Sequence, residues 1–260
     1  MTRSVKDQLN HFIDVSFPPI RIISLVPSQT ELLYDLGLDH EIIGITEYCV
    51  FPTHWARSKP IVGGTKDFDI EKIRSLQPDL IIANKEENSR ELIEKLQTMF
   101  PVWISDVVSL NNALEMILAV GELTNRRDRA EIISKSIQIA FDSLDPLVCV
   151  NYTVLYLIWR KPWMGVASNT FIDCMLNKLG LENSLKSAER YPKLSEADIL
   201  NLNPDYIFLS SEPYPFKEKH VMELQQLCSS SRIILVDGKM FSWYGSHLMQ
   251  SPTYFKSLKL

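Results

Sequence analysis

The residue types that usually perform catalysis are present in this sequence, but their spacing matches no catalytic motif. The stretch Ser242–His247 offers a serine and a histidine, yet no acid that would orient the histidine lies at a readable spacing. The chain has no GxSxG, GxxxxGK[ST] or GxGxxG motif, and Gly63 and Gly64 are typical of a tight turn rather than of a phosphate-binding loop. We therefore predict no catalytic residues and expect that the chain is not an enzyme.

Metal-ligating residues are equally scattered. The histidines share no HxxxH or HxH spacing, and the four cysteines form no CxxC pair, so we predict free thiols, no metal site and no intrinsic cofactor. Cys149 lies in an apolar run and is expected in the core. An alternative is that Cys49 and His54, with Tyr48 nearby, ligate haem iron, although an isolated histidine after a proline is more typical of an exposed loop.

Aromatic residues carry the stronger functional signal, because in the second half they gather after expected strands rather than at helical spacing. Trp163 follows a charged stretch and a proline, and Tyr214 lies between two prolines, so both are expected in turns that do not need a large ring for packing. These rings suit a flat or bulky organic ligand such as a corrin, a porphyrin or an aromatic siderophore. The set is Trp159, Trp163, Tyr191, Tyr214, Phe216, Phe241, Trp243 and Tyr244.

The elements that position these residues alternate as in α/β proteins. Strands are expected over 21–26, 41–45, 80–83, 102–104 and 148–158, and helices over 69–76 and 89–99. A capping-box pattern from Ser28 to Glu31 predicts a helix start, and Gly37 predicts its end. Asn125 is predicted to cap a long helix from Arg126 to Leu144.

The chain also repeats itself, which indicates two similar lobes. The order Ile73, Leu76, Pro78, Asp79 recurs 126 residues later at 199–205, and a Ser-x-Thr start leading to Leu-Gly-Leu precedes each copy. We predict an N-terminal α/β lobe over 1–121, a connecting helix over 122–146 that alone bridges the lobes, and a C-terminal α/β lobe over 147–260. Each lobe is expected to hold a central, mainly parallel sheet, with a ligand-binding cleft between the lobes.

The composition limits the classes of partner and the locations that we expect for the chain. The net charge of -5 and the absence of a lysine and arginine cluster argue against nucleic acid. No stretch is long and apolar enough to cross a bilayer, and the first ten residues lack the pattern of a secretory signal. The chain as written is therefore expected to be unexported, either as a cytoplasmic protein or because a leader was removed, and a monomer is expected.

Three stretches together resemble one known family. They are PPIRIISLVPSQTELLYDLGL, IVGGTKDFDIEKIRSLQPDLIIAN and LSEADILNLNPDYIFLSS, and they are similar to the substrate-binding proteins that serve vitamin B12, haem and ferric siderophore ABC importers. The resemblance extends from Pro18 onward and implies two lobes, a rigid connecting helix, no catalysis, and a periplasmic or cell-surface location. It implies a receptor that closes on a corrinoid or ferric chelate, and the alternative is a cytoplasmic binding or sensing protein on the same scaffold.

The resemblance also implies particular site residues. Tyr48 stands where the B12 receptor has a ligand-contacting tyrosine, and Tyr191 stands where it has a tryptophan before the same proline, whereas Thr65 and Asn84 replace tryptophans. The expected ligand-binding residues are Pro27, Ser28, Tyr48, Gly64, Lys85, Trp163, Tyr191, Glu212, Trp243 and Tyr244.

Docking to the permease in this family uses one surface glutamate per lobe, seven residues before the repeated proline. Glu71 fits this position in the first lobe. In the second lobe the position holds Ala197, and Glu196 or Asp198 beside it would have to substitute.

Overall fold

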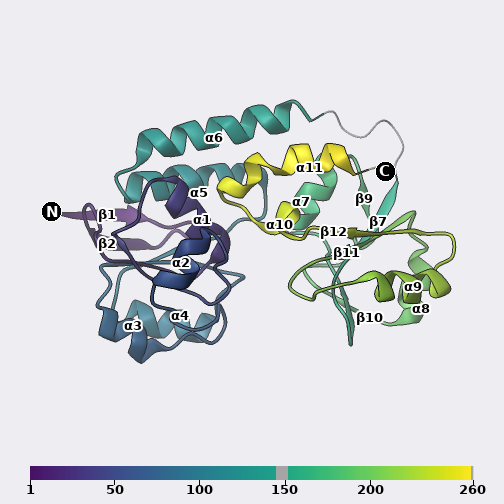
Figure 1. The fold of residues 1–260 in the computed structure, drawn as a ribbon, viewed down its shortest axis with the longest axis horizontal. Coiled ribbons are helices and arrows are strands. Elements are labelled where there is room, and N and C mark those ends of the chain that lie inside the picture. Colours follow the sequence, from purple (N-terminus) through teal and green to yellow (C-terminus); the bar gives the residue numbers. More distant parts are fainter. Residues whose placement is uncertain (145–151, 259) are drawn as a thin grey trace. The chain divides into compact units, whose positions relative to one another are not determined.

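The computed structural model describes residues 1–144, 152–258 and 260, and their packing divides them into two compact units. The first unit consists of Met1–Val107, Asn111–Gln138 and Tyr244–Met249, and the second of Val108–Leu110, Ile139–Trp243 and Gln250–Leu260. Each unit has its own sheet and its own hydrophobic core, and Figure 1 shows the order of the elements. The predicted α/β class, with two lobes that each hold a mainly parallel sheet, is confirmed.

The sheet of the first unit has four parallel strands in the order β4-β3-β5-β6. Their bounds are Ile22–Ser24 for β3, Ile42–Ile45 for β4, Leu80–Asn84 for β5 and Val102–Ser105 for β6. The strands are rich in isoleucine and mostly buried, as expected for parallel strands that are covered on both faces. A separate antiparallel hairpin of β1 (Thr2–Lys6) and β2 (Phe12–Ser16) precedes them.

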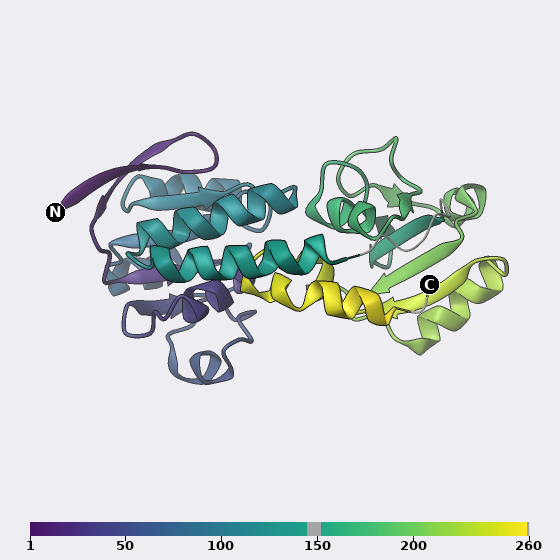
Figure 2. The ribbon, with the colours of Figure 1, turned by 90° about the horizontal axis from the view of Figure 1, so that it is seen from above.

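Helices cover this sheet through apolar faces. Ile73, Ile93 and Leu96 belong to the same core cluster as the strand residues, so α3 and α4 pack on the sheet. The helices are α1 (Pro27–Asp35), α2 (Thr53–Ser58), α3 (Ile70–Leu76), α4 (Arg90–Gln97), α5 (Leu110–Leu123) and α6 (Arg127–Asp142), with a 3₁₀ turn η1 (Ser246–Met249). Figures 1 and 2 both show α5 and α6 side by side, and a Cβ at Gly121 would lie 2.2 Å from the Cβ of Ala130. The glycine therefore permits this close approach.

Two predicted helix starts are wrong. The capping box at Ser28 does not form, because α1 begins earlier: Val26 is the N-cap, no side chain caps it, and Pro27 occupies the first helical turn, where its fixed φ and missing N–H cost nothing. Asn125 does not cap α6. It has a left-handed backbone (φ 57°) and ends α5, because its N–H donates to Glu122 O and the next N–H donates to Gly121 O.

The sheet of the second unit is mixed. Strands β7, β11 and β12 pair in parallel, β9 pairs in parallel with β7, and β8 and β10 add antiparallel pairs. The strands are β7 (Thr153–Trp159), β8 (Trp163–Gly165), β9 (Glu182–Asn183), β10 (Lys193–Leu194), β11 (Tyr206–Ser210) and β12 (Arg232–Val236). The helices are α7 (Phe171–Lys178), α8 (Glu196–Leu202), α9 (Glu218–Leu227), α10 (Lys239–Ser242) and α11 (Ser251–Ser257). The part of the predicted strand before Tyr152, with Cys149, lies outside the described residues.

The repeated sequence folds into the same structure twice. In each copy a helix (α3 or α8) ends at a left-handed residue, Gln77 (φ 45°) or Asn203 (φ 40°), and Pro-Asp leads into the strand β5 or β11. The aspartate carboxylate makes equivalent hydrogen bonds in both copies. Asp79 accepts hydrogen bonds from the N–H groups of Ile20 and Arg21, and Asp205 accepts them from the N–H and the hydroxyl of Thr153. Each therefore ties its turn to the chain that enters the neighbouring strand.

The described chain corrects two predicted assignments. Val108–Leu110, predicted within the N-terminal lobe (1–121), belong to the second unit. Residues Tyr244–Met249 were assigned to the C-terminal lobe (147–260), but they belong to the first unit, because η1 packs against α1. The chain thus passes between the units on both sides of this segment, on both sides of Val108–Leu110 and within α6, so the connecting helix is not the only connection. The helix predicted over 126–144 is confirmed as α6, and residues 145 and 146 of the predicted linker lie outside the described residues.

Candidate functional site

The candidate site of the first unit is the edge where its parallel strands end. Pro27 and Ser28 follow β3, Tyr48 follows β4, and Lys85 follows β5 directly. Because the carboxyl ends of neighbouring parallel strands meet at one edge of a sheet, the fold brings these predicted ligand-binding residues to the same edge.

A buried hydroxyl and thiol network lies under this edge. The Thr30 hydroxyl donates to Ser24 Oγ at 2.7 Å and to Val26 O at 2.9 Å, and the Cys49 thiol lies 3.1 Å from Thr30 Oγ1 and 3.2 Å from Thr46 Oγ1. Burial raises the pKa of the Cys49 thiol, which keeps it protonated. A buried, protonated thiol that contacts two hydroxyls is a structural residue, and this argues against Cys49 as a haem ligand.

An amide network holds β5 and β6 to the loop after β3. Asn84 Nδ2 donates to Ser105 Oγ at 3.0 Å, and Gln29 Nε2 donates to the same oxygen at 2.5 Å. Asn88 accepts the N–H of Asn84 at 2.8 Å and donates to Leu25 O at 3.0 Å. These side chains are nearly fully buried, so the loops that present the edge are fixed by hydrogen bonds before any ligand arrives.

Tyr48 and Gly64 lie together on the exposed part of the edge. Tyr48 is 56% exposed, and a Cβ on Gly64 would lie 3.2 Å from its ring, 3.2 Å from Glu47 Oε1 and 2.2 Å from Asp67 Oδ1. A ring and two carboxylates thus border a position that has no side chain. Lys85, also in the predicted set, is bound by Asp106 at 2.6 Å.

The segment Tyr244–Met249, named here the strap, adds to the same unit. The Tyr244 hydroxyl donates to Glu87 Oε1 at 2.6 Å, and the His247 imidazole lies 3.0 Å from a Glu31 oxygen. A Cβ at Gly245 would lie 2.6 Å from Ser28 O, so only glycine allows the strap to approach α1 this closely. Tyr244 therefore joins Ser28 in the first unit, whereas the sequence had placed it in the second lobe.

Two of the predicted residues of the second unit, Glu212 and Trp243, share one hydrogen-bonded group with Ser242. Trp243 Nε1 donates to Glu212 Oε1 at 2.9 Å, and the Ser242 hydroxyl donates to the same oxygen at 3.2 Å. Burial raises the pKa of Glu212, and these two donors oppose that rise. Ser242 is thus bonded to Glu212 while His247 is bonded to Glu31, so the serine and histidine of this stretch serve different networks.

Trp163 was predicted in a turn but lies in a strand, whereas Tyr214 lies in a bend between β11 and α9, as predicted. Trp163 begins β8, is 7% exposed, and stacks on Phe216 with ring centroids 6.1 Å apart in the second core. Tyr214 packs against the same Phe216 ring at 4.8 Å, and its hydroxyl lies 3.3 Å from His220 Nε2. Tyr191 is half-buried, and Pro192 O after it accepts the N–H of Gly165. The rings of Trp163 and Tyr214 thus both pack against Phe216, a contact that the neighbouring prolines do not reveal.

The predicted docking residues differ in the contacts that their carboxylates already make within the protein. Glu71 lies in the first turn of α3 with a side chain that is 79% exposed and a long contact of 3.8 Å to Arg74. Asp198 is engaged in a capping box, in which it accepts the N–H and hydroxyl of Ser195 at 2.8 and 2.7 Å. Glu196 is exposed at the start of α8. Of the two acids beside Ala197, Glu196 is therefore the one that the cap does not use.

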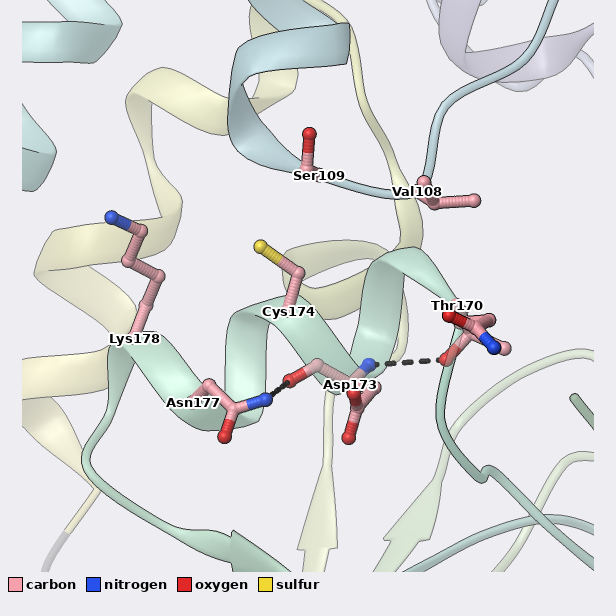
Figure 3. Close-up of a pocket in the computed structure, with 8 residues that line it drawn as sticks. Val108, Ser109, Thr170, Asp173, Cys174, Asn177 and Lys178 are labelled. Atoms are coloured by element: carbon pink, nitrogen blue, oxygen red, sulfur yellow. Dashed lines mark hydrogen bonds between the residues drawn. The ribbon is translucent and has the colours of Figure 1, made fainter. Parts of the chain in front are cut away.

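A pocket of about 430 Å³ lies elsewhere in the second unit and contains none of the predicted ligand-binding residues (Figure 3). It is formed by one side of α7 and the residues before α5, and its lining is Val108, Ser109, Asn169, Thr170, Asp173, Cys174, Asn177 and Lys178. The Asn177 side chain donates to the Asp173 carbonyl, and the Asp173 N–H donates to the Thr170 hydroxyl. The Asp173 carboxylate accepts from Asn183 Nδ2, so these polar groups already have partners within the protein.

Neither a metal-binding cluster nor a helix able to span a membrane occurs in the described ranges 1–144 and 152–258. No cluster of three or more histidine, cysteine, aspartate or glutamate side chains that could hold a metal ion occurs in them. None of their helices combines the length and apolar character that a membrane span needs. Cys49, Cys174 and Cys228 are free thiols, as predicted.

Comparison with known proteins gives one family. Residues 22–231 match the model of a family described as periplasmic binding protein. An uncharacterized ABC transporter substrate-binding lipoprotein of Bacillus subtilis is 24% identical over 214 residues, which are 78% of this chain and 68% of that protein. A vitamin B12-binding protein of Vibrio campbellii is 27% identical over 206 residues, which are 76% of this chain and 74% of that protein.

A solved structure supports the fold. The periplasmic catecholate-siderophore binding protein of Vibrio cholerae superposes with a TM-score of 0.80 over 99% of this chain and 100% of its own. At 12% identity, this likeness concerns the fold alone.

Proposed function

Because the chain belongs to the periplasmic binding protein family, we propose that it is a solute-binding receptor that captures a corrinoid or a ferric chelate for an ABC importer. The family match over residues 22–231 carries the proposal. It is supported by relatives whose names include an ABC transporter substrate-binding lipoprotein and vitamin B12-binding proteins. On this proposal the protein acts by binding and not by catalysis.

The strand edges supply the binding surface in this proposal. In the first unit, Tyr48 offers an exposed ring beside Gly64, and the buried networks under the edge hold the loops in place. A preformed surface loses little conformational entropy on binding, which favours tight capture of a rigid macrocycle or chelate. In the second unit, Glu212, Trp243 and Tyr191 are the residues that we expect to contact the ligand, and Trp163 would support them from the core.

We further propose that Glu71 and Glu196 dock the receptor on its permease. Both are exposed in the first turn of equivalent helices, where the helix dipole favours a carboxylate. Charge-assisted pairs with two arginines of a partner would fix the orientation of the complex.

The proposal is tested by uptake. Cells that carry the importer, with this gene deleted or restored, are given radiolabelled cobalamin or ferric siderophore at nanomolar concentration. Uptake that depends on the gene supports an importer receptor. Ligand binding by the purified protein without any gene-dependent uptake would support a binding or sensing protein on the same scaffold instead.

A further inference from the structure

The N-terminal hairpin reaches the carboxyl end of β6. Its strands β1 and β2 precede residues 22–231, which are the part of the chain that matches the family, and the turn between them contains Gln8. The Gln8 N–H donates to Ile104 O at 3.1 Å, and the Trp103 indole donates to Lys6 O at 3.3 Å. The turn of the hairpin therefore lies against the end of β6, at the edge where the parallel strands of the first unit finish.

The turn that carries Gln8 is itself held in one conformation. The buried Asp7 carboxylate accepts the N–H groups of Leu9 and His11 at 2.9 and 2.8 Å. The Leu9 side chain packs on the core cluster of the first unit. Because the aspartate bonds the backbone of its own turn and the leucine is anchored in the core, the backbone that presents the Gln8 side chain is fixed.

The Gln8 side chain holds both ends of the loop between β6 and α5. Its Oε1 accepts the N–H of Asp106 at 3.0 Å, directly after β6, and its Nε2 donates to Asn112 O at 3.0 Å, in the first turn of α5. Each atom of the amide meets a main-chain group of the opposite kind, whereas a flipped amide would place donor against donor and acceptor against acceptor. One glutamine therefore closes the loop over 106–112.

Asp106, which this loop carries, holds the side chain of Lys85. The Asp106 carboxylate accepts from Lys85 Nζ at 2.6 Å, and the two side chains are 25% and 43% exposed. The main-chain N–H of Lys85 donates to Ser105 O at 3.0 Å, so the lysine is held at both its backbone and its ammonium. An ammonium has three N–H donors, and Asp106 Oδ2 accepts one of them.

Taken with the proposed function, on which this step rests, we infer that the N-terminal hairpin is part of the ligand-binding machinery and that Gln8 is a positioning residue within it. Gln8 fixes the main chain of Asp106, and Asp106 fixes the ammonium of Lys85 at the strand edge, where it can donate to an oxygen of the ligand. A lysine side chain has many rotamers, so an ammonium that is already held loses less conformational entropy when the ligand binds.

A double-mutant comparison of ligand affinity tests this role. The probes are dicyanocobinamide, haem and a ferric tris-catecholate, and the one that binds the wild-type protein is titrated by calorimetry. Gln8→Met keeps the length of the side chain and removes both of its hydrogen bonds, so Kd should rise about five- to tenfold. Lys85→Met should itself weaken binding, and in that background Gln8→Met should change Kd by less than about twofold, because the ammonium that Gln8 positions is gone.

An equal rise of Kd in both backgrounds would show that Gln8 supports only the fold, and an unchanged Kd in Gln8→Met alone would show that the hairpin does not reach the ligand. Either result overturns the inference. Asp106→Asn releases the ammonium while Gln8 stays in place, so it should weaken binding by a similar factor, and it decides the question even where Gln8→Met does not fold.

A matched control comes from the second unit. Gln225 Nε2 also bonds main-chain carbonyl oxygens of a loop, those of Cys228, Ser229 and Ser231, but this loop precedes β12 and lies at the amino end of that strand. Gln225→Met should therefore leave Kd unchanged. A wild-type protein that binds none of the three probes contradicts the proposed function itself, and this step falls with it.

Discussion

Replacing Trp163 by alanine distinguishes a core ring from a ligand-contacting ring. The side chain is 7% exposed, stacks on Phe216 and lies under the Arg160 guanidinium at 5.3 Å. Truncating a buried tryptophan costs about 3–5 kcal/mol, and the stacking with Phe216 is part of that loss. We expect the free energy of unfolding to fall by about 4 kcal/mol and Tm to fall by ~10 °C.

The assay is guanidinium unfolding followed by circular dichroism, with thermal scans at equal protein concentration. Trp159→Ala serves as a matched control, because that ring is 40% exposed and should cost about 1 kcal/mol. Tyr48→Ala, at 56% exposure, should leave Tm within about 1–2 °C and should weaken ligand binding instead. A Trp163→Ala protein of unchanged stability that binds ligand more weakly would refute the assignment of this ring to the core.

Three further outcomes follow from single contacts. Glu212→Gln should raise Tm at pH 7, because burial raises the pKa of this carboxyl and its ionised form therefore lowers stability as the pH rises through that pKa. The gain in Tm should vanish below about pH 4, where the carboxyl of the wild-type protein and the amide of the variant are both neutral. Thermal scans across pH measure this difference. Tyr244→Phe removes the donor to Glu87 and should cost about 1–2 kcal/mol in denaturant unfolding, while an unchanged midpoint would show that the strap does not depend on this bond. Glu71→Arg should leave ligand affinity unchanged and abolish binding to the permease, and uptake that survives the charge reversal would remove this residue from the docking surface.

The sequence predicted the elements well wherever local chemistry decides the structure. Buried isoleucine runs became strands, Gly37 ended α1 with a left-handed backbone (φ 82°), and the repeated Pro-Asp turn recurred with the same hydrogen bonds. Boundaries failed where two local signals competed. Pro27 started α1 ahead of the Ser28 cap pattern, and Asn125 ended one helix instead of starting the next.

Site residues were harder to predict because their environment depends on distant parts of the chain. Nothing local shows that Trp163 turns into the core to meet Phe216, or that Tyr244 crosses to Glu87, 157 positions away in the sequence. The sequence analysis missed Glu87, which accepts the Tyr244 hydroxyl. Its position three residues after the end of β5 was readable, since the carboxyl ends of parallel strands mark the edge where ligands bind.

The central claim is that this protein binds one chelate or corrinoid tightly, and a direct binding measurement tests it. The purified chain is mixed with cobalamin, dicyanocobinamide, haem and several ferric siderophores, and complexes are detected by native mass spectrometry and by quenching of tryptophan fluorescence. The account predicts a single complex of one ligand per chain with a Kd of about 1 μM or lower, which corresponds to a binding free energy of roughly -8 kcal/mol. A protein that remains unliganded with every compound at a hundred times that concentration would contradict the account.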